Sequence, residues 1–142
     1  MSNINKPNKF LPTTKEEMKQ RGWDELDVVL ITGDAYIDSP FMGIAVVGRI
    51  LEDIGLRVGI IGQPDVNSDI DIKRMGEPKL FWGVSGGSID SMVSNYTATK
   101  RFRSTDDYTP GGKNDKRPDR ATLVYTNLIR RYFKNTVPIV LG

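Results

Sequence analysis

Polar side chains that could bind a ligand follow the first strongly apolar segment of the chain. In the stretch VVLITGDAYIDSP, residues 28–40, the side chains of Asp34, Tyr36 and Asp38 come directly after the apolar run. The two carboxylates could accept hydrogen bonds from a ligand hydroxyl or amine. They could equally make a turn and cap a helix without any ligand, because aspartate favours both positions. The residues alone leave both interpretations open.

A second polar group, made of Ser85, Gly86, Gly87 and Ser88, follows another apolar segment. We expect a helix after it, over about 88–96, whose first N–H groups and dipole would favour an anion such as phosphate. The alternative, which the paired glycines favour, is a tight turn packed closely against other backbone. The chain has neither GxGxxG after its first apolar segment nor GxxxxGK[ST]. The missing nucleotide-binding motifs argue against a dehydrogenase or an ATPase.

Composition removes several kinds of chemistry. The 142 residues include no cysteine and no histidine, which excludes disulfides, thiolate-bound zinc, iron–sulfur ligation and a Ser-His-Asp triad. We therefore predict no catalytic residue and no metal site within this chain. The formal net charge is only +2, and no apolar run approaches the roughly 20 residues that cross a bilayer. These features favour a cytoplasmic protein that does not contact a membrane.

The elements that must position these residues alternate between strands and helices. Continuous apolar runs predict buried strands at 27–32, 56–61, 80–85 and 137–141. Helices are expected at 14–22, from Ser39-Pro40 to about 54, at 67–75, at 88–96 and after Asp119. The helix after Pro40 would bury one face made of Phe41, Ile44, Val47, Leu51 and Ile54. This order predicts an α/β fold with three layers and a mainly parallel sheet, flavodoxin- or Rossmann-like.

Parallel strands place their carboxyl ends at one edge of the sheet, where such folds bind ligands. We therefore expect the two polar groups to meet there. Residues 1–12 read as a mobile leader, and 13–142 as a single α/β domain with a long loop at 99–118. The last apolar strand reaches Gly142 with no helix after it. We expect the chain to be a fragment of a longer protein, with a short edge strand as the alternative.

The long loop is basic and carries aromatic residues. Phe102 and Tyr108 are interleaved with cations, as in grooves that bind single-stranded nucleic acid; the cations are Lys100, Arg101, Arg103, Lys113, Lys116, Arg117 and Arg120. Four carboxylates in the same region would weaken a phosphate track: Asp106, Asp107, Asp115 and Asp119. We therefore favour a solvated loop, or one that docks on another domain, over a nucleic-acid partner.

Long motifs in this sequence resemble a known family. GWDELDVVLITGDAYIDSPFMGIAVVGRILEDIGLRVGIIGQPD is similar to the N-terminal region of the YgiQ-type family of uncharacterised radical SAM proteins. YTATKRFRSTDDYTPGG and KRPDRATLVYTNLIRRYFKNTVPIVLG are similar to later parts of that region. The resemblance implies a radical SAM barrel beyond these residues, holding a [4Fe-4S] cluster and S-adenosylmethionine.

The element order also resembles the cobalamin-binding domains that precede many radical SAM barrels. Those domains carry a D-x-H-x-x-G loop; here Asp34 matches the aspartate, Tyr36 replaces the histidine and Ser39 replaces the glycine. Tyrosine offers no imidazole nitrogen, so we do not expect cobalt ligation. Ser85 and Leu141-Gly142 are partial matches to positions that contact the ligand. Binding of cobalamin without a protein ligand stays open.

From the resemblance we expect an accessory N-terminal domain that caps or positions the barrel of a radical SAM protein of unknown substrate. The expected partner is that barrel, and this chain alone should be inert. The alternative is a free-standing flavodoxin-like domain that binds a small phosphate or cobalamin-type ligand. Its candidate ligand-binding residues are Asp34, Tyr36, Asp38, Ser85, Gly86, Gly87 and Ser88.

Overall fold

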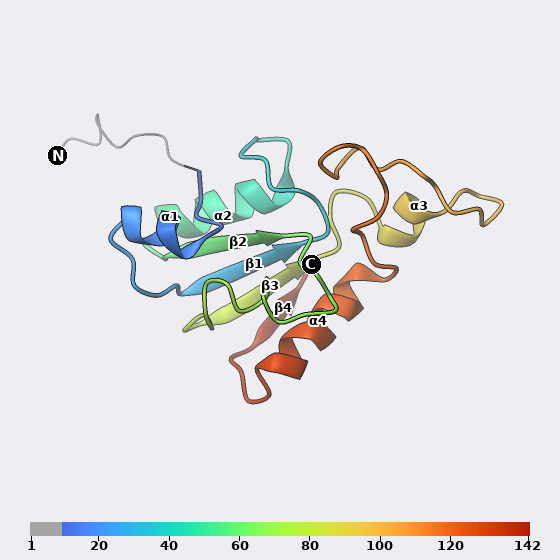
Figure 1. Cartoon of the computed structure of the whole chain (residues 1–142). Helices are drawn as coiled ribbons and strands as arrows, with labels where there is room; N and C mark the ends of the chain where they lie inside the picture. Colours follow the sequence, from blue (N-terminus) through green and yellow to red (C-terminus); the bar gives the residue numbers. More distant parts are fainter. Residues whose placement is uncertain (1–9) are drawn as a thin grey trace.

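A four-stranded, all-parallel sheet forms the centre of the protein in the computed structural model, which describes residues 10–142 (Figure 1). The strand order is β2-β1-β3-β4. The elements are α1 Lys15–Gln20, β1 Val28–Thr32, α2 Gly43–Asp53, β2 Val58–Gly62, β3 Phe81–Ser85, α3 Ser91–Asn95, α4 Ala121–Tyr132 and β4 Ile139–Leu141. The predicted α/β class and parallel sheet are confirmed.

Strand order reverses between β1 and β3, and this decides where the helices lie. The β1–α2–β2 unit adds a strand on one side of β1, whereas β3–α4–β4 adds a strand on the other side of β3. Right-handed crossovers in opposite directions place their helices on opposite faces of a sheet. Accordingly, α2 covers one face and α4 covers the other (Figure 1). The resulting three layers bring the carboxyl ends of β1 and β3 together at the reversal.

The two faces of the sheet are filled very unequally. On the α4 face, a large cluster of buried side chains includes Val29, Ile31, Trp82 and Tyr125. On the α2 face, the buried cluster holds only five residues, namely Leu11, Val28, Leu30, Val58 and Ile60. All five residues of β1 are buried, as expected for a central parallel strand. The α2 face therefore has an incomplete hydrophobic core over β3 and β4.

Three predicted helix starts differ from the structure. α2 begins at Gly43 rather than at Ser39-Pro40, because the Ser39 hydroxyl accepts a hydrogen bond from Phe41 N (3.2 Å) in a local turn. α3 begins at Ser91, where Asp90 caps it. α4 begins at Ala121 after a left-handed Arg120. In each case a side chain forms a local or tertiary hydrogen bond that the helical pattern does not contain.

Two further expectations were wrong. Residues 67–75 form consecutive turns, not a helix. The expected buried face of α2 is also wrong in part, since Phe41 and Ile54 are exposed whereas Ala45 and Gly48 are buried. Small residues let α2 approach β1 and β2 closely, and a Cβ on Gly48 would collide with Leu11. That close approach turns the larger side chains of α2 away from the core.

Thr14 caps α1, since Glu17 N donates to Thr14 Oγ1 at 3.2 Å. Residues 1–9 of the expected leader lie outside the described residues. The leader boundary at residue 12 is corrected, because Leu11 is fully buried and Ile60 N donates to the Pro12 carbonyl (2.9 Å). This backbone contact ties the segment to β2.

Candidate functional site at the carboxyl edge of the sheet

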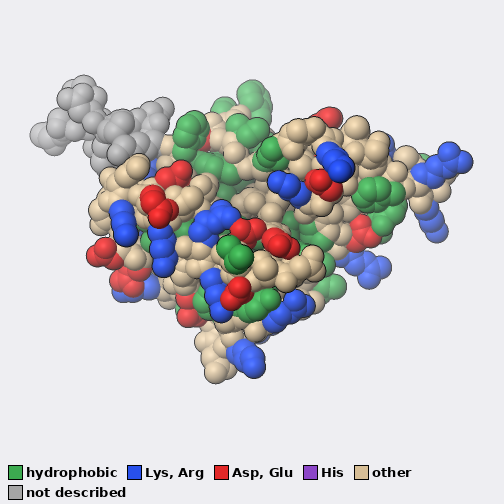
Figure 2. Space-filling view, viewed as in Figure 1, with side chains coloured by type: hydrophobic (Ala, Val, Ile, Leu, Met, Phe, Trp, Pro, Cys, Tyr) green, Lys and Arg blue, Asp and Glu red, His purple; other side chains and the backbone are tan. Residues whose placement is uncertain are grey.

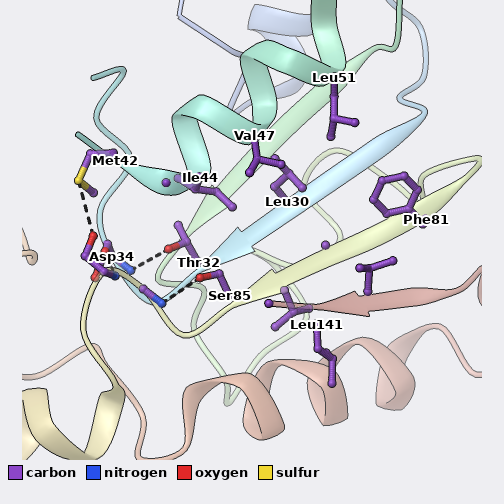
Figure 3. Close-up of a pocket in the computed structure, with 17 residues that line it drawn as sticks. Leu30, Thr32, Asp34, Met42, Ile44, Val47, Leu51, Phe81, Ser85 and Leu141 are labelled. Carbon is purple, nitrogen blue, oxygen red and sulfur yellow. Dashed lines mark hydrogen bonds between the residues drawn. The ribbon is translucent and has the colours of Figure 1, made fainter. Parts of the chain in front are cut away.

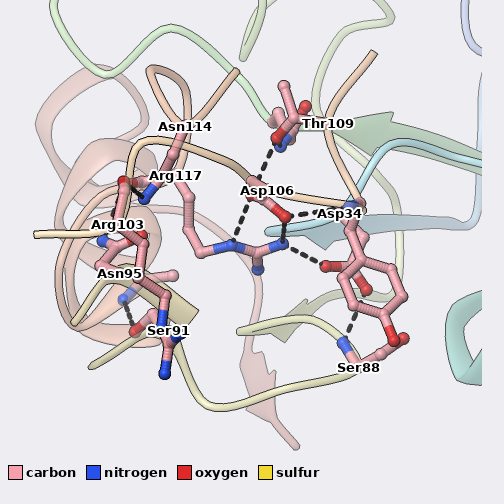
Figure 4. Close-up of polar contacts among 12 residues, drawn as sticks. Asp34, Ser88, Ser91, Asn95, Arg103, Asp106, Thr109, Asn114 and Arg117 are labelled. Carbon is pink, nitrogen blue, oxygen red and sulfur yellow. Dashed lines mark hydrogen bonds and ion pairs between the residues drawn. The ribbon is translucent and has the colours of Figure 1, made fainter. Parts of the chain in front are cut away.

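A buried ionic cluster lies at the carboxyl edge, where β1 and β3 meet. Arg117 donates through Nη2 to Asp34 Oδ1 (2.6 Å) and through Nε to Asp106 Oδ2 (3.1 Å). The side chains of Arg117 and Asp34 are 0% and 2% exposed. Figure 4 shows the guanidinium between the two carboxylates. We call Asp34, Asp106 and Arg117 the ionic hub.

The hub is satisfied by further hydrogen bonds. Arg117 Nη1 donates to the Gly86 carbonyl (2.9 Å), and Ser88 N donates to Asp34 Oδ2 (2.6 Å). Asp106 also accepts from Tyr108 N (2.9 Å). A buried guanidinium is stable only when its charge and its N–H groups are paired in this way. The hub therefore joins three segments that are far apart in sequence: the β1 turn, the β3 turn and the long loop.

Burial and hydrogen bonding act in opposite directions on these groups. Burial raises the pKa of Asp106, but hydrogen bonds from Arg117, Tyr108 N and Thr109 outweigh it and leave the pKa below its usual value. Burial lowers the pKa of Arg117, and the bonds to Asp34 and Asp106 more than restore it. Both Asp106 and Arg117 are thus held in their charged forms.

The turn after β3 binds an anion from the same chain. Gly87 N donates a hydrogen bond to Ser85 Oγ (3.2 Å), and Ser88 N donates one to the Asp34 carboxylate. Gly87 adopts φ +115°, and a Cβ there would lie 2.6 Å from Arg117 Nη1. The glycine pair is therefore used for close backbone approach, the alternative that its residue type favours. The role of residues 85–88 in binding an external ligand stays a prediction.

The structure separates the first three candidate residues. Asp34 points into the hub, whereas Tyr36 OH accepts a hydrogen bond from Leu11 N (3.1 Å) and Asp38 pairs with Arg49 of α2. Burial raises the pKa of Tyr36, so its hydroxyl stays protonated. Only Asp34 meets the residues 85–88, and any ligand role of Tyr36 and Asp38 stays a prediction.

The basic loop is solvated only in part, since residues 99–105 are exposed whereas its later residues pack on the domain. It packs on the sheet edge of its own domain through Ala35 N, which donates to the Tyr108 carbonyl (2.8 Å). Asp106, Thr109, Asn114 and Arg117 are all buried. Sequence reasoning counted Arg117 as one phosphate-binding cation among several and so missed its role. A single sequence carries no signal that distinguishes a buried arginine from an exposed one in a polar loop.

Beside the hub, an open apolar trough of about 440 Å³ runs along the α2 face of β1, β3 and β4 (Figure 3). Its walls include Leu30, Val47, Phe81 and Val140, and its floor passes over Gly83. Its polar end is made of Thr32, Asp34, Ser85 and Ser88. Thr32 Oγ1 already accepts from Asp34 N (3.2 Å). The trough can bury the apolar surface of a binding partner, whereas most of its polar groups already form hydrogen bonds within the chain.

Three buried side-chain oxygens lack a hydrogen-bond partner among residues 10–142, namely Asn95 Oδ1, Asn114 Oδ1 and Tyr125 OH. Tyr125 OH lies in the α4-face core and makes no hydrogen bond to the part of the chain that the structure describes. Burial raises the pKa of Tyr125, so the phenol is neutral.

The fold and this edge define a small α/β domain in which the charged residues of the hub pair with one another and join segments of the same domain. The chain matches the Radical SAM N-terminal family model over residues 10–142. It belongs to that family. The predicted link to radical SAM proteins is thereby confirmed, whereas the YgiQ-type assignment and the cobalamin-domain likeness stay predictions.

Close relatives are much longer than this chain. A UPF0313 protein of Thermotoga petrophila is 62% identical over 133 residues, covering 94% of this chain and 23% of the relative. Relatives from Fusobacterium nucleatum and Pseudomonas aeruginosa are 62% and 53% identical and are covered over 22% and 18% of their lengths. The chain thus spans about a fifth to a quarter of these proteins. No solved structure matches it significantly.

The chain does not fit the iron–sulfur cluster that its family name implies. Thiolates bind iron–sulfur clusters, and the sequence has no cysteine. Among residues 10–142, no group of three or more acidic side chains is arranged to hold a metal ion. No helix in the described part of the chain is long and apolar enough to span a membrane. Any cluster would have to be bound by residues outside this chain.

Proposed function

We propose that this chain is the accessory N-terminal domain of a radical SAM protein, and that it docks on and positions the catalytic region. The observation that carries the proposal is the family match over residues 10–142, in a chain that covers only 23% of a 62% identical relative. The cluster and S-adenosylmethionine implied by the family would be held by that other region. This chain contributes a binding surface and no reacting group.

Association in trans tests this function. The chain would be co-expressed with the part of the Thermotoga petrophila protein that it does not match, carrying a separate affinity tag. We expect the two polypeptides to co-purify as a 1:1 complex. After anaerobic reconstitution with iron and sulfide, only preparations containing the larger part should show cluster absorption. Failure to associate, or cluster formation by this chain alone, would refute the proposal.

A second candidate function rests on the trough, which lies at the strand-order reversal where open α/β sheets bind ligands. In this alternative the chain is a free-standing binder of a small phosphate or cobalamin-type ligand, contacted by Ser85 and Ser88. This function is the weaker candidate, because Gly87 N and Ser88 N already donate hydrogen bonds within the chain and are not free to bind a phosphate. Calorimetric titration with flavin mononucleotide and with cobalamin distinguishes the two, because saturable micromolar binding is expected only for a ligand domain.

A further inference from the structure

Helix α2 is apolar on more of its circumference than its own contacts require. Its buried side is formed by Ala45 and Gly48, with Ile44 and Leu51 half-buried beside them. A second set of apolar residues on the same helix is exposed to solvent, namely Val46, Val47, Ile50 and Ile54. We call these four residues the α2 stripe. A helix with apolar residues on both sides is normally buried on both.

The α2 stripe and the trough form one continuous surface. Val47 belongs to both, because it lies on α2 and lines the trough opposite Phe81 (Figure 3). The surface continues to the edge strand β4, where Val140 is 53% exposed. Figure 2 shows some hydrophobic side chains at the upper edge of the molecule, on the side where α2 lies. Monomeric proteins rarely leave an apolar surface of this extent uncovered.

We propose that the trough and the α2 stripe are the face on which the remaining polypeptide of the radical SAM protein docks, through an apolar layer such as an amphipathic helix. This inference rests on the proposed function and adds the surface that performs it. Among residues 10–142, the only charged side chain lining the trough is that of Asp34, whose carboxylate is already paired with Arg117. The contacting surface of the partner should therefore be apolar rather than charged.

The shape of this surface favours polypeptide over the other possible occupants. A small ligand could fill the trough but would leave Ile50 and Ile54 exposed on the outer side of α2. A second copy of the chain could cover both. In the relatives, however, this domain is covalently joined to about three-quarters of the protein. Covalent linkage gives a local concentration of order millimolar, which outcompetes self-association at ordinary protein concentrations.

A matched pair of substitutions tests the surface in the co-expressed complex described above. Ile50→Glu places a charge on the α2 stripe, where the side chain is 57% exposed. Ile70→Glu makes the same change at a side chain that is 72% exposed, in the β2–β3 connection outside this surface. We expect Ile50→Glu to weaken association at least tenfold and Ile70→Glu to leave it within twofold. Circular dichroism and thermal unfolding would show that both variants fold.

A second measurement avoids introducing charge. Because the chain has no cysteine, Val140→Cys and Ile70→Cys each create a single thiol. In the complex, the rate of thiol alkylation at position 140 should fall at least tenfold relative to the chain alone. The rate at position 70 should not change.

The outcomes separate the two proposals. Association that tolerates Ile50→Glu, with position 140 still reactive, overturns this inference and leaves the proposed function standing. No association of the unmodified chains overturns both. Protection of position 140 in the isolated chain, rising with its concentration, overturns the inference in favour of a second copy. Protection of that thiol by cobalamin or flavin mononucleotide alone overturns it in favour of a small ligand.

Discussion

The ionic hub and the apolar trough are neighbours built on the same two strands, β1 and β3, yet they are completed in opposite ways. In the hub, the buried charges and the main N–H donors find partners within residues 10–142, and the side chains of Arg117 and Asp34 are almost inaccessible. In the trough, apolar side chains line an open surface that the chain itself does not cover. Charged groups at an edge of the sheet are thus not by themselves a sign of a ligand site. Here they hold the domain together, and the apolar surface beside them is the one left exposed.

The strongest way to break this contrast is to remove the cation of the hub. Arg117→Met would leave Asp34 and Asp106 buried without their partner, and breaking a buried pair costs about 3–5 kcal/mol. Urea unfolding followed by circular dichroism measures the loss. The control is Arg57→Met, which removes the partly exposed pair with Asp27 and should cost about 1–2 kcal/mol. Equal losses of unfolding free energy in both variants would mean that the hub stabilises the domain no more than a surface ion pair does.

A smaller effect is expected from crowding the hub without changing its charge. Gly87→Ala would strain a backbone at φ +115° and place a methyl group 2.6 Å from Arg117 Nη1. We expect a loss of about 2 kcal/mol in unfolding free energy. Gly111→Ala is the control, because it also has positive φ but would meet nothing within 4 Å. A Gly87→Ala loss no larger than the control would contradict the close packing described here.

Acid should weaken the domain through its paired carboxylates. Hydrogen bonding to Arg57 lowers the pKa of Asp27 from 3.8 to about 2, and the pKa of Asp106 is also lowered. Because the unfolded chain binds protons at higher pH than the folded chain, this stabilisation is full above about pH 5 and is lost as the pH falls from about 4 toward 2. Chemical unfolding at a series of pH values measures it. In Arg57→Met the decline should be shallower, and an identical decline would contradict the assignment to Asp27.

The smallest effect on stability is expected in the trough. Val47→Ala removes apolar surface that is still half exposed in this chain, so its unfolding free energy should change by about 0.5 kcal/mol or less. Val29→Ala, the same change in the buried α4-face cluster, should cost about 1–3 kcal/mol because it leaves a cavity. A large loss at Val47 would show that the trough is already part of the core of the isolated chain.

Much of the fold followed from local patterns. The apolar runs at 27–32, 56–61 and 80–85 predicted strands close to their observed bounds, because a strand buried on both faces needs continuous apolar sequence. The start of α4 and the turns at 67–75 were placed less well. At the start of α4 a bond between distant segments fixes the backbone, Ala121 N donating to Ser91 Oγ (3.0 Å), whereas the turns at 67–75 are fixed by local bonds such as Asp65 N donating to Asp71 Oδ2 (2.8 Å). Such bonds leave no periodic signal.

The candidate site was predicted in position more than in role. Asp34 and residues 85–88 do meet at the carboxyl edge, as parallel strands require. Arg117 and Asp106 were assigned to a solvated loop, because charged residues are usually exposed and no pattern marks the exceptions. The exposed α2 stripe was missed for the opposite reason. Apolar spacing predicts that a helix face will be covered, but it does not say by what.

The sequence by itself determined the layered α/β architecture, the lack of any thiolate or imidazole ligand, and the link to radical SAM proteins. The first two properties depend on residue types and short-range periodicity, and the link rests on the resemblance of long motifs to that family. Only the tertiary structure decided that Arg117 joins three distant segments, and that one face of the sheet carries an uncovered apolar surface. Both depend on which segments meet in space, and strand order and crossover handedness determine that meeting.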